Sequence, residues 1–400
     1  MGWDRGDRGT AEPSPCPIFV IVMIDRNQQT KYTQHIAIMR HFGELGVHMM
    51  NISGSIMSKD TVAATVEDGQ ITVSDTALLP LYLKRTGDVE SWLRGRAIDT
   101  HRTNSRLLKK ALRLVSADDV ELVLKVNAST ITDSYWFRQD GANLKYEDVR
   151  FKDNSFDKLA LNGDPDSFNQ PYSPTPELTN IGSFEKCWRL TGGKWWMIKQ
   201  GNELERFSEL FICRLGQALG FEMADYLPEN GTIKSPDFTD GASVNYEAAD
   251  GIVGDDEDYV VNFEAFWNLS PELAKQYLQI IYLDTLCFNM DRHTKNYGVL
   301  RDVESGAILR MAPNYDNNIA LFARGIPSNL DRTEDKLVSL YCGLLEQDSS
   351  ALEIAKQFPV PTKVMIEECA NKTSIPIDKE TVCKYITNGS NQIQERIQTL

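Results

Sequence analysis

The sequence predicts an α+β protein of two lobes, preceded by a mixed α/β region. Three observations predict this arrangement. Short β-branched runs over residues 62–66 and 71–73, joined by an Asp-Gly turn, indicate a hairpin early in the chain. An apolar strand pattern over residues 195–199 is followed directly by an amphipathic helix over 203–219. The last hundred residues are mostly helical in pattern, so strands come first and helices later.

The bulk composition is that of an ordinary globular protein. The chain has 400 residues, 42% of them hydrophobic and 25% charged, and this length accommodates two domains with separate cores. The net charge of -15 repels nucleic acid and anionic membranes, so we expect no direct partner of either kind. The seven cysteines form no C-x-x-C pair, which argues against a zinc ribbon and favours reduced thiols. The longest apolar run near the start, residues 18–24, is too short to span a membrane, and we expect a cytoplasmic protein.

Changes of pattern along the chain divide it into four parts. A stretch rich in Pro, Asp, Ser and Asn over residues 162–175 indicates a linker, and a different pattern begins after it. The predicted parts are an unassigned extension over residues 1–48, an N-terminal α/β region over 49–175, a first lobe over 176–240 and a helical second lobe over 241–400.

Further elements are expected in the first two parts. In the extension, residues 18–24 have the pattern of a strand and residues 35–45 that of a weak helix. In the α/β region, residues 88–115 are predicted to be helical, and residues 121–126 are predicted to form a strand.

A group of polar residues follows a long predicted helix that runs from Pro271 to about residue 288. Asp291 and Asn296 are separated by four residues, which is the spacing of a kinase catalytic loop. In such a loop the aspartate accepts the proton of the acceptor hydroxyl and the asparagine binds magnesium. A short hairpin then brings Asp316, in N-Y-D-N-N, back toward the loop as a second magnesium ligand. The combination predicts phosphoryl transfer from ATP with Mg²⁺.

Lys199 and the helix after it supply the next expected contacts. A strand lysine that pairs with a glutamate on the following helix is how kinases orient the α and β phosphates of ATP. Glu205 and Glu209 are four residues apart and therefore share one helix face. We predict Glu209 as the partner of Lys199.

A glycine-containing loop precedes the lysine strand. The segment G-S-F-E-K contains Gly182, Ser183 and Lys186, whose backbone N–H groups and ammonium are suited to cover phosphates. Within the catalytic loop, His293 either contacts the γ-phosphate or braces the loop, and bracing is the favoured interpretation. Arg292 and Lys295 are expected to neutralise charge in an acidic protein that must bind ATP.

Together these segments resemble the HipA-like family of toxin-type serine/threonine kinases. The specific segments are N-M-D-R-H-T-K-N-Y-G over residues 289–298, A-P-N-Y-D-N-N over 312–318, G-S-F-E-K and M-I-K. The resemblance covers residues 180–321 and implies a two-lobed, protein-kinase-like fold with ATP and Mg²⁺ as cofactors. It assigns the catalytic base and both magnesium ligands to the residues named above.

The resemblance also implies contacts and partners that spacing alone does not. The segment I-K-S-P-D-F falls where the hinge against adenine is expected, which adds Lys234, Asp237 and Phe238 to the nucleotide contacts. Thr179 stands where the family carries an autophosphorylated serine. The segments W-L-R-G-R-A-I-D-T-H-R and T-D-S-Y-W-F resemble clostridial-type members. The implied partners are a protein substrate, such as a translation component, and an antitoxin-like helix-turn-helix regulator.

Two other functions are compatible with the same residues. D-R-H-x-x-N loops also occur in phosphoinositide kinases, so a lipid or small-molecule kinase stays open, although the acidic composition disfavours it. The third interpretation is a pseudokinase that binds a regulator, which the complete set of catalytic residues disfavours.

Overall fold

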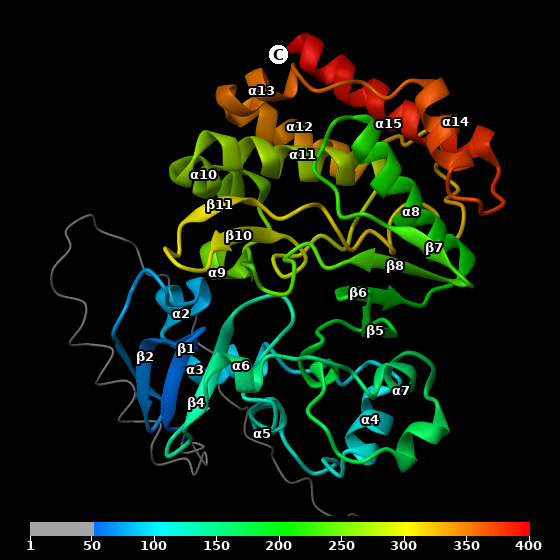
Figure 1. The fold of residues 1–400 in the computed structure, drawn as a ribbon. Coiled ribbons are helices and arrows are strands. Elements are labelled where there is room, and N and C mark those ends of the chain that lie inside the picture. Colours follow the sequence, from blue (N-terminus) through cyan, green and yellow to red (C-terminus); the bar gives the residue numbers. More distant parts are fainter. Residues whose placement is uncertain (1–51) are drawn as a thin grey trace, which may run out of the picture. The chain divides into compact units, whose positions relative to one another are not determined.

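The computed structural model describes residues 52–400 and begins with a four-stranded antiparallel sheet (Figure 1). Its strands are β1 (Gly54–Ser58), β2 (Thr61–Glu67), β3 (Gln70–Val73) and β4 (Tyr135–Gln139), in the order β3-β2-β1-β4. The predicted hairpin is confirmed. Glu67 pairs with Gln70 across Asp68 and Gly69, and both turn residues have the positive φ that a two-residue hairpin turn needs.

The prediction of one long helix over residues 88–115 is wrong, because this segment forms two short helices. These are α3 (Val89–Arg94) and α4 (Ser105–Ala111). The chain leaves α3 at Gly95, and Arg102 in the connection is drawn into the interior by carbonyl groups of a later loop. A continuous helix would leave Arg102 unable to make these bonds. The other short helices of this region are α2 (Leu81–Thr86), α6 (Tyr146–Val149), α7 (Asp157–Asn162), η1 (Pro165–Asn169) and η2 (Pro176–Thr179).

The strand predicted over residues 121–126 is also wrong, since this segment is helix α5 (Asp119–Leu124). The Asp118 carboxylate accepts a hydrogen bond from the Glu121 N–H, which is a favourable N-cap. The apolar side chains of α5 are buried, and the helix packs against α3 and η2. The cap and this packing outweigh the strand preference of a short β-branched run.

A second antiparallel sheet carries the predicted lysine strand. Its strands are β5 (Lys186–Thr191), β6 (Lys194–Lys199), β7 (Leu227–Glu229) and β8 (Thr232–Pro236), in the order β5-β6-β8-β7. Helix α8 (Glu203–Ala218) follows β6, as predicted. Asn202 and Glu205 form a capping box that fixes the start of α8, and Phe207, Phe211 and Leu215 are on its buried face.

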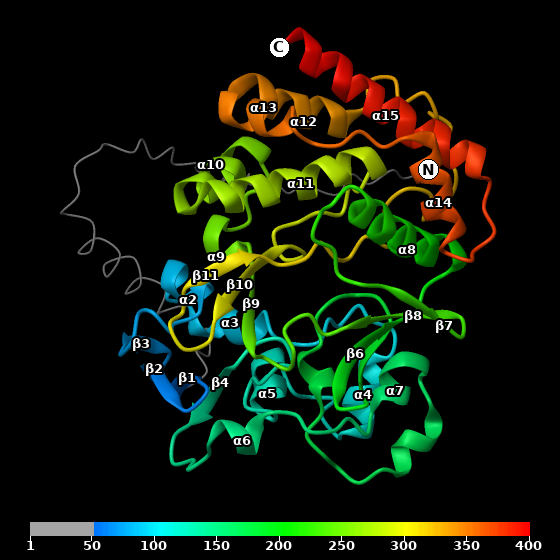
Figure 2. The same cartoon turned by 45° about the horizontal axis from the view of Figure 1, so that its top comes forward.

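The third sheet and the helices beyond it form the rest of the described chain (Figure 2). β9 (Val244–Ala248), β10 (Gly298–Asp302) and β11 (Ile308–Met311) pair antiparallel in the order β11-β10-β9, so the predicted hairpin after the catalytic loop is confirmed. Helix α11 (Pro271–Cys287) is confirmed with Ser270 as its N-cap. It is buried over most of its length between the sheets and the later helices. The remaining helices are α9 (Asp250–Val253), α10 (Tyr259–Leu269), α12 (Lys336–Gln347), α13 (Ser349–Ala355), α14 (Lys363–Asn371) and α15 (Lys379–Thr399).

A buried polar cluster joins the first sheet to the third. The Arg301 guanidinium on β10 forms an ion pair with Glu247 on β9, and Nη1 donates to the Tyr135 hydroxyl at 2.9 Å. Tyr135, on β4, in turn donates to Glu247 Oε1 at 2.7 Å. Arg301 also donates to the backbone carbonyls of Ala77 and Leu79, at 2.6 and 3.1 Å. The N-terminal region is thereby fastened to the strand that follows the catalytic loop.

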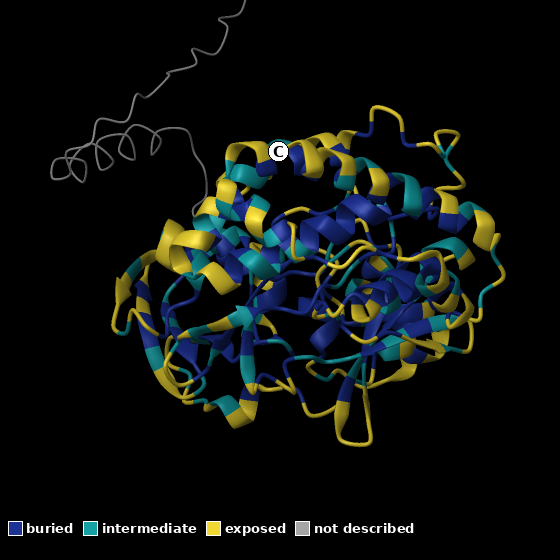
Figure 3. Ribbon diagram, turned by 90° about the horizontal axis from the view of Figure 1, so that it is seen from above, coloured by how far each residue is buried: buried dark blue, intermediate teal, exposed yellow. Residues whose placement is uncertain are grey.

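Along most helices, buried residues are interspersed with exposed ones, as expected for helices that turn one face to the core and the other to solvent (Figure 3). The described residues, 52–400, belong to one compact unit, and the predicted domain boundaries within it stay predictions. The mixed α/β composition that the sequence predicts is confirmed. The strand expected at residues 18–24 and the helix expected at 35–45 lie outside the described residues. Within residues 52–400, no helix has the length and apolar character needed to cross a bilayer.

Candidate active site

The predicted catalytic loop lies between the end of α11 and the start of β10. Its conformation is fixed by bonds within the loop. Asn289 Oδ1 accepts from the Asp291 N–H at 3.1 Å, and the Asn296 side-chain amide donates to the Asp291 carbonyl at 2.5 Å. His293 Nδ1 accepts from the Lys295 N–H at 3.3 Å, while the ring is exposed. These contacts agree with the bracing role for His293.

Arg292 has a different place from the expected one. Its guanidinium is buried and forms a bidentate pair with Asp284 of α11, at 2.8 and 2.9 Å. One nitrogen, Nη1, donates to the carbonyls of both Asn296 and Tyr315 at 2.8 Å. Arg292 therefore holds the catalytic loop against the segment that carries Asp316, and it is not placed to neutralise a phosphate. It completes its bonding with the side-chain oxygens of Asn314 and Asn317, at 3.0 and 2.7 Å.

Lys199 points into the site and contacts Asp316. Its Nζ is 2.8 Å from Asp316 Oδ1, 3.2 Å from Glu209 Oε2 and 3.3 Å from the Tyr226 hydroxyl. Burial alone would lower the pKa of Lys199, but Asp316 and Glu209 raise it well above its usual range. Burial likewise opposes ionisation of Asp316, but Lys199 and then Lys186 outweigh it and hold the pKa of that carboxyl well below its usual range. Lys199 and Asp316 therefore form a pair in which the ammonium and the carboxylate are both ionised.

The surroundings of Asp291 shift its pKa in the direction opposite to that of Asp316. Burial raises the pKa of its carboxyl, His293 opposes this, and the carboxylate of Asp316 adds to it. The side chain is half-buried and forms no ion pair within the described part of the chain. A carboxylate with a raised pKa is a better proton acceptor than an ordinary surface aspartate.

The glycine loop covers a buried ammonium. Lys186, at the start of β5, is only 9% exposed, and its Nζ forms no hydrogen bond or ion pair with any described residue. Burial lowers the pKa of Lys186 to about 8, although Asp316 opposes the shift. Gly182 has φ +104°, and a β-carbon there would collide with the ammonium. A buried ammonium that makes no hydrogen bond is costly, so this position is suited to an anionic ligand.

One large cavity, of about 670 Å³, connects these groups. Phe238, Tyr246 and Tyr315 form an aromatic cluster on its wall, with ring centroids 5.8 Å apart in each pair and the two tyrosine hydroxyls hydrogen-bonded. An aromatic wall beside buried cations suits a planar base joined to phosphates. The predicted residues that line the cavity are Gly182, Ser183, Lys186, Lys199, Asp237, Phe238, Asp291, His293, Asn296 and Asp316.

Two of the predicted hinge residues need correction. Lys234 does not line the cavity. Its ammonium pairs with Glu229 at 2.6 Å and lies over the Trp196 ring, because alternation along β8 directs it away from the face that Ser235 presents. Asp237 lies at the cavity, but its carboxylate accepts three bonds from Thr239 and Gly241 and so stabilises a turn.

Three contributors were not predicted. Tyr226 contacts Lys199 from the loop after α8, and Tyr246 reaches the cavity from β9. Tyr315 lies inside N-Y-D-N-N but was not singled out. No local pattern marks Tyr226 or Tyr246, since their places depend on pairing between distant strands. For Tyr315, its position next to a predicted metal ligand was an available signal.

The residues present fit a magnesium ion. The side-chain oxygen of Asn296 is buried and accepts no hydrogen bond from any described residue. Asp316 uses Oδ1 for Lys199, and its second oxygen has no hydrogen bond to the part of the chain that the structure describes. Among residues 52–400 no group of three or more His, Cys, Asp or Glu side chains is arranged so that it could hold a metal ion by itself. Magnesium bound with nucleotide needs no such cluster, because water and phosphate supply most of its ligands.

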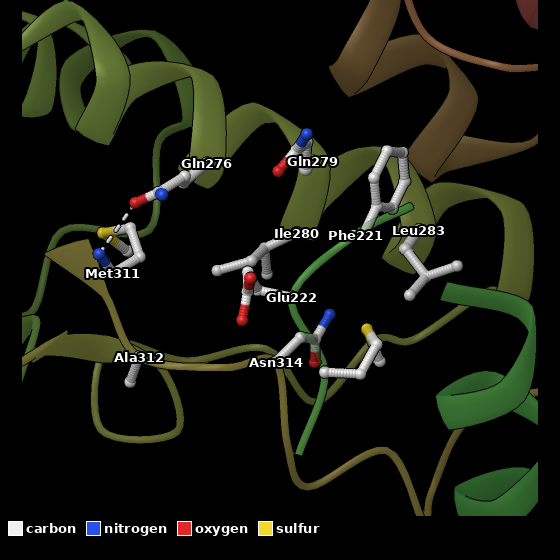
Figure 4. A pocket seen from close by; sticks show the side chains of 10 residues that line it. Phe221, Glu222, Gln276, Gln279, Ile280, Leu283, Met311, Ala312 and Asn314 are labelled. Carbon is white, nitrogen blue, oxygen red and sulfur yellow. Dashed lines mark hydrogen bonds between the residues drawn. The ribbon is translucent and has the colours of Figure 1, made fainter. Parts of the chain in front are cut away.

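A second hollow, behind Asn314, is too small to compete as a ligand site (Figure 4). Its volume is about 10 Å³, which is room for about one water molecule. Gln276 of α11 accepts from the Met311 N–H at 2.8 Å on its wall, and Phe221, Ile280 and Leu283 make it largely apolar.

Comparison with known proteins identifies a fold. No family model matches the sequence, and no curated protein matches it. Among solved structures, a chain of the Shewanella oneidensis MR-1 toxin–antitoxin complex of HipA, HipB and operator DNA matches 87% of this chain and 97% of its own, with a TM-score of 0.51 and 14% identity. The Helicobacter pylori proinflammatory kinase CtkA matches 54% of this chain and 95% of its own, with a TM-score of 0.36 and 18% identity. The likeness to the HipA complex chain, with its TM-score of 0.51, shows a similar fold, and at 14% identity it concerns the fold alone.

Proposed function

We propose that the chain is an ATP- and Mg²⁺-dependent phosphotransferase, a HipA-like serine/threonine protein kinase that transfers the γ-phosphate of ATP to a protein hydroxyl. One observation carries the proposal. The charged pair of Lys199 and Asp316 shares a cavity with the half-buried carboxylate of Asp291 and the unsatisfied side-chain oxygen of Asn296. This is the set of groups that phosphoryl transfer needs.

The nucleotide is proposed to bind with its phosphates beside two ammonium groups. Lys199 and Lys186 are buried cations on neighbouring strands, and only Lys199 has carboxylate partners among the described residues. A polyphosphate would supply the missing countercharge for Lys186 and compensate for its burial. The aromatic cluster of Phe238, Tyr246 and Tyr315 is the proposed neighbour of the base.

Asp291 is the proposed general base. The acceptor hydroxyl gives its proton to the Asp291 carboxylate while its oxygen forms a bond to the γ-phosphorus. The bond between that phosphorus and the β–γ bridging oxygen breaks, and ADP leaves with the bonding electrons. Asn296 and Asp316 are the proposed ligands of Mg²⁺, which would neutralise charge on the phosphates. Lys199 keeps Asp316 ionised, and hence able to bind a cation, across the neutral pH range.

The finer assignments rest on sequence resemblance. These are the clostridial type, a translation component as substrate and autophosphorylation. The two-lobed layout and the cytoplasmic location are also proposals, and they rest on the order of predicted strands and helices and on the composition and apolar runs of the sequence. The matched HipA structure is a complex with HipB and operator DNA, which supports an antitoxin-like helix-turn-helix regulator as a proposed partner. Thr179 lines the same cavity, but its hydroxyl is engaged in a hydrogen bond. The Thr179 hydroxyl is buried and donates to the Ser129 carbonyl at 2.7 Å.

The test is transfer of radiolabel from γ-labelled ATP, with Mg²⁺, to the protein itself and to proteins of a cell lysate. We expect labelling by the wild type. Asp291→Asn should lower the rate at least about a hundredfold, which is the range for loss of a general base. Asp255→Asn is the matched control, because Asp255 is exposed and outside the cavity. Equal labelling by wild type and Asp291→Asn would rule out this assignment.

A binding measurement separates the kinase from a pseudokinase. Asp291→Asn should bind Mg-ATP about as tightly as the wild type, whereas Lys199→Met should bind it weakly, as a thermal-shift titration would report. Binding in both wild type and Asp291→Asn without any transfer by either would favour a regulator-binding module. Transfer to lipid or sugar alcohols and not to proteins would favour a small-molecule kinase.

A further inference from the structure

Arg102 lies far from the catalytic loop in sequence, yet its guanidinium is buried against the glycine loop, defined here as residues 180–186. Nη2 donates to the Asn180 carbonyl at 2.6 Å and to the Gly182 carbonyl at 3.0 Å, and Nε donates to Gly182 at 3.1 Å. Nη1 donates to the Lys186 carbonyl at 3.4 Å. One side chain thus binds carbonyls at the beginning, the middle and the end of the loop.

These bonds use nearly all of the donor capacity of Arg102. The residue is 1% exposed, so each N–H that lost its partner would stay unsatisfied in the interior. The nearest carboxylate is that of Glu177, 3.9 Å from Nη1. Glu177 in turn accepts hydrogen bonds from the Asn180 side chain at 2.9 Å, at the start of the loop, and from the Trp188 N–H at 2.7 Å, just beyond its end. It also accepts from the Asn154 side-chain amide at 2.8 Å. Arg102 and Glu177 together therefore organise the loop and its flanks.

Held in this way, the loop closes over Lys186. The Gly182 carbonyl turns toward Arg102, and the backbone of Gly182, at a positive φ that glycine adopts freely, lies directly against the Lys186 ammonium. Gly182, Ser183 and Lys186 line the cavity, whereas Arg102 does not. Arg102 therefore does not contact a ligand in the cavity, and it affects such a ligand through the loop and through its positive charge close to Lys186.

We propose that Arg102 is a positioning residue, which holds the glycine loop in the conformation that presents Lys186 and the loop N–H groups to the phosphates of the nucleotide. This inference rests on the proposed function of the same cavity. It also gives the N-terminal region a part in the reaction, because Arg102 comes from the connection between α3 and α4. Loss of the bonds to Asn180, Gly182 and Lys186 releases the loop, while Lys199 and the catalytic loop keep their own contacts.

The kinetic test compares Arg102→Met and Arg102→Lys with Arg106→Met. Arg106 is an exposed neighbour and serves as the matched control. For Arg102→Met we expect KM for Mg-ATP to rise about tenfold or more, with kcat changed less than about threefold, which is the pattern for lost binding that the ground and transition states share. Arg102→Lys keeps a donor but not the fork that reaches several carbonyls, so it should be intermediate.

Hydrogen exchange tests whether a loosened glycine loop causes the predicted rise in KM. Backbone amides of residues 183–186 should exchange faster in Arg102→Met than in wild type and Arg106→Met, with exchange of α11 unchanged. Equal loop exchange, or a fall in kcat with KM unaltered, would overturn the inference. If the wild type bound no nucleotide, the proposed function would fail and this role with it. If it bound Mg-ATP but the loop did not respond to Arg102→Met, only the role of Arg102 would fail.

Discussion

Replacing Arg292 with methionine should destabilise the protein and loosen the catalytic loop. The Arg292 side chain is 3% exposed and that of Asp284 is 1% exposed, so the change leaves an uncompensated carboxylate in the interior. Breaking a buried pair in this way costs about 3–5 kcal/mol. The carbonyls of Asn296 and Tyr315 also lose their shared donor, although they are partly able to recruit water. We therefore expect a loss of about 3–5 kcal/mol in the free energy of unfolding.

Urea unfolding followed by tryptophan fluorescence measures this loss, provided that the m-value is unchanged between variants. Arg310→Met is the control. Arg310 has a 41% exposed side chain with a surface partner, Glu222, at 3.6 Å, and such pairs contribute at most about 1 kcal/mol. In Arg292→Met/Asp284→Leu the buried charge is gone, so the double variant should lose about 1–3 kcal/mol less than the sum of the single losses.

Two results would refute this reasoning. One is a loss for Arg292→Met no greater than that for Arg310→Met, which would mean that the pair is not buried in solution. The other is strict additivity in the double variant, which would mean that Asp284 and Arg292 do not depend on each other.

Three further predictions concern single positions. Because burial lowers the pKa of Lys186 to about 8, the folded state holds fewer protons there than the unfolded state between about pH 8 and pH 10, and stability should rise with pH in this window relative to Lys186→Met. The same loss of charge should raise KM for Mg-ATP above pH 8 in wild type only, and a flat profile would contradict it. Gly182→Ala should displace the Lys186 ammonium and raise KM for Mg-ATP, as steady-state kinetics would show; an unchanged KM would count against the closed loop. Gly389→Ala should cost about 1–3 kcal/mol in urea unfolding, because the added methyl collides with the buried guanidinium of Arg332, and a stabilised variant would contradict the packing.

Local signals in the sequence were sufficient for much of the framework. Ser270 and Pro271 fixed the start of α11, and the Asp-Gly turn fixed the β2–β3 hairpin, because caps and tight turns are decided by a few adjacent residues. The cavity brings together Asp291, Asn296 and Asp316, all three of which were predicted from spacing and the intervening hairpin. Their catalytic roles stay proposals.

The failures lie where distant contacts decide the outcome. The segment at α5 has strand-forming residues, but a cap at Asp118 and packing against other helices make it helical. Lys234 was assigned to the hinge by position, and strand alternation turned it away. Arg102 could not be recognised, since its partners lie 78 or more positions further along the chain. The burial of Arg292 could not be predicted either, because spacing does not reveal which side chains of a loop turn inward.

The cluster of Arg301, Glu247 and Tyr135 limits how the protein can be dissected. A fragment that began after the predicted linker would keep the catalytic loop but would lose Tyr135 and the carbonyls of Ala77 and Leu79. The Arg301 guanidinium would then lose these three hydrogen-bond partners and keep Glu247 as its main remaining partner. Recombinant protein should therefore include all residues from β1 onward. The region that carries the catalytic loop is stabilised by contacts with the region before the predicted linker.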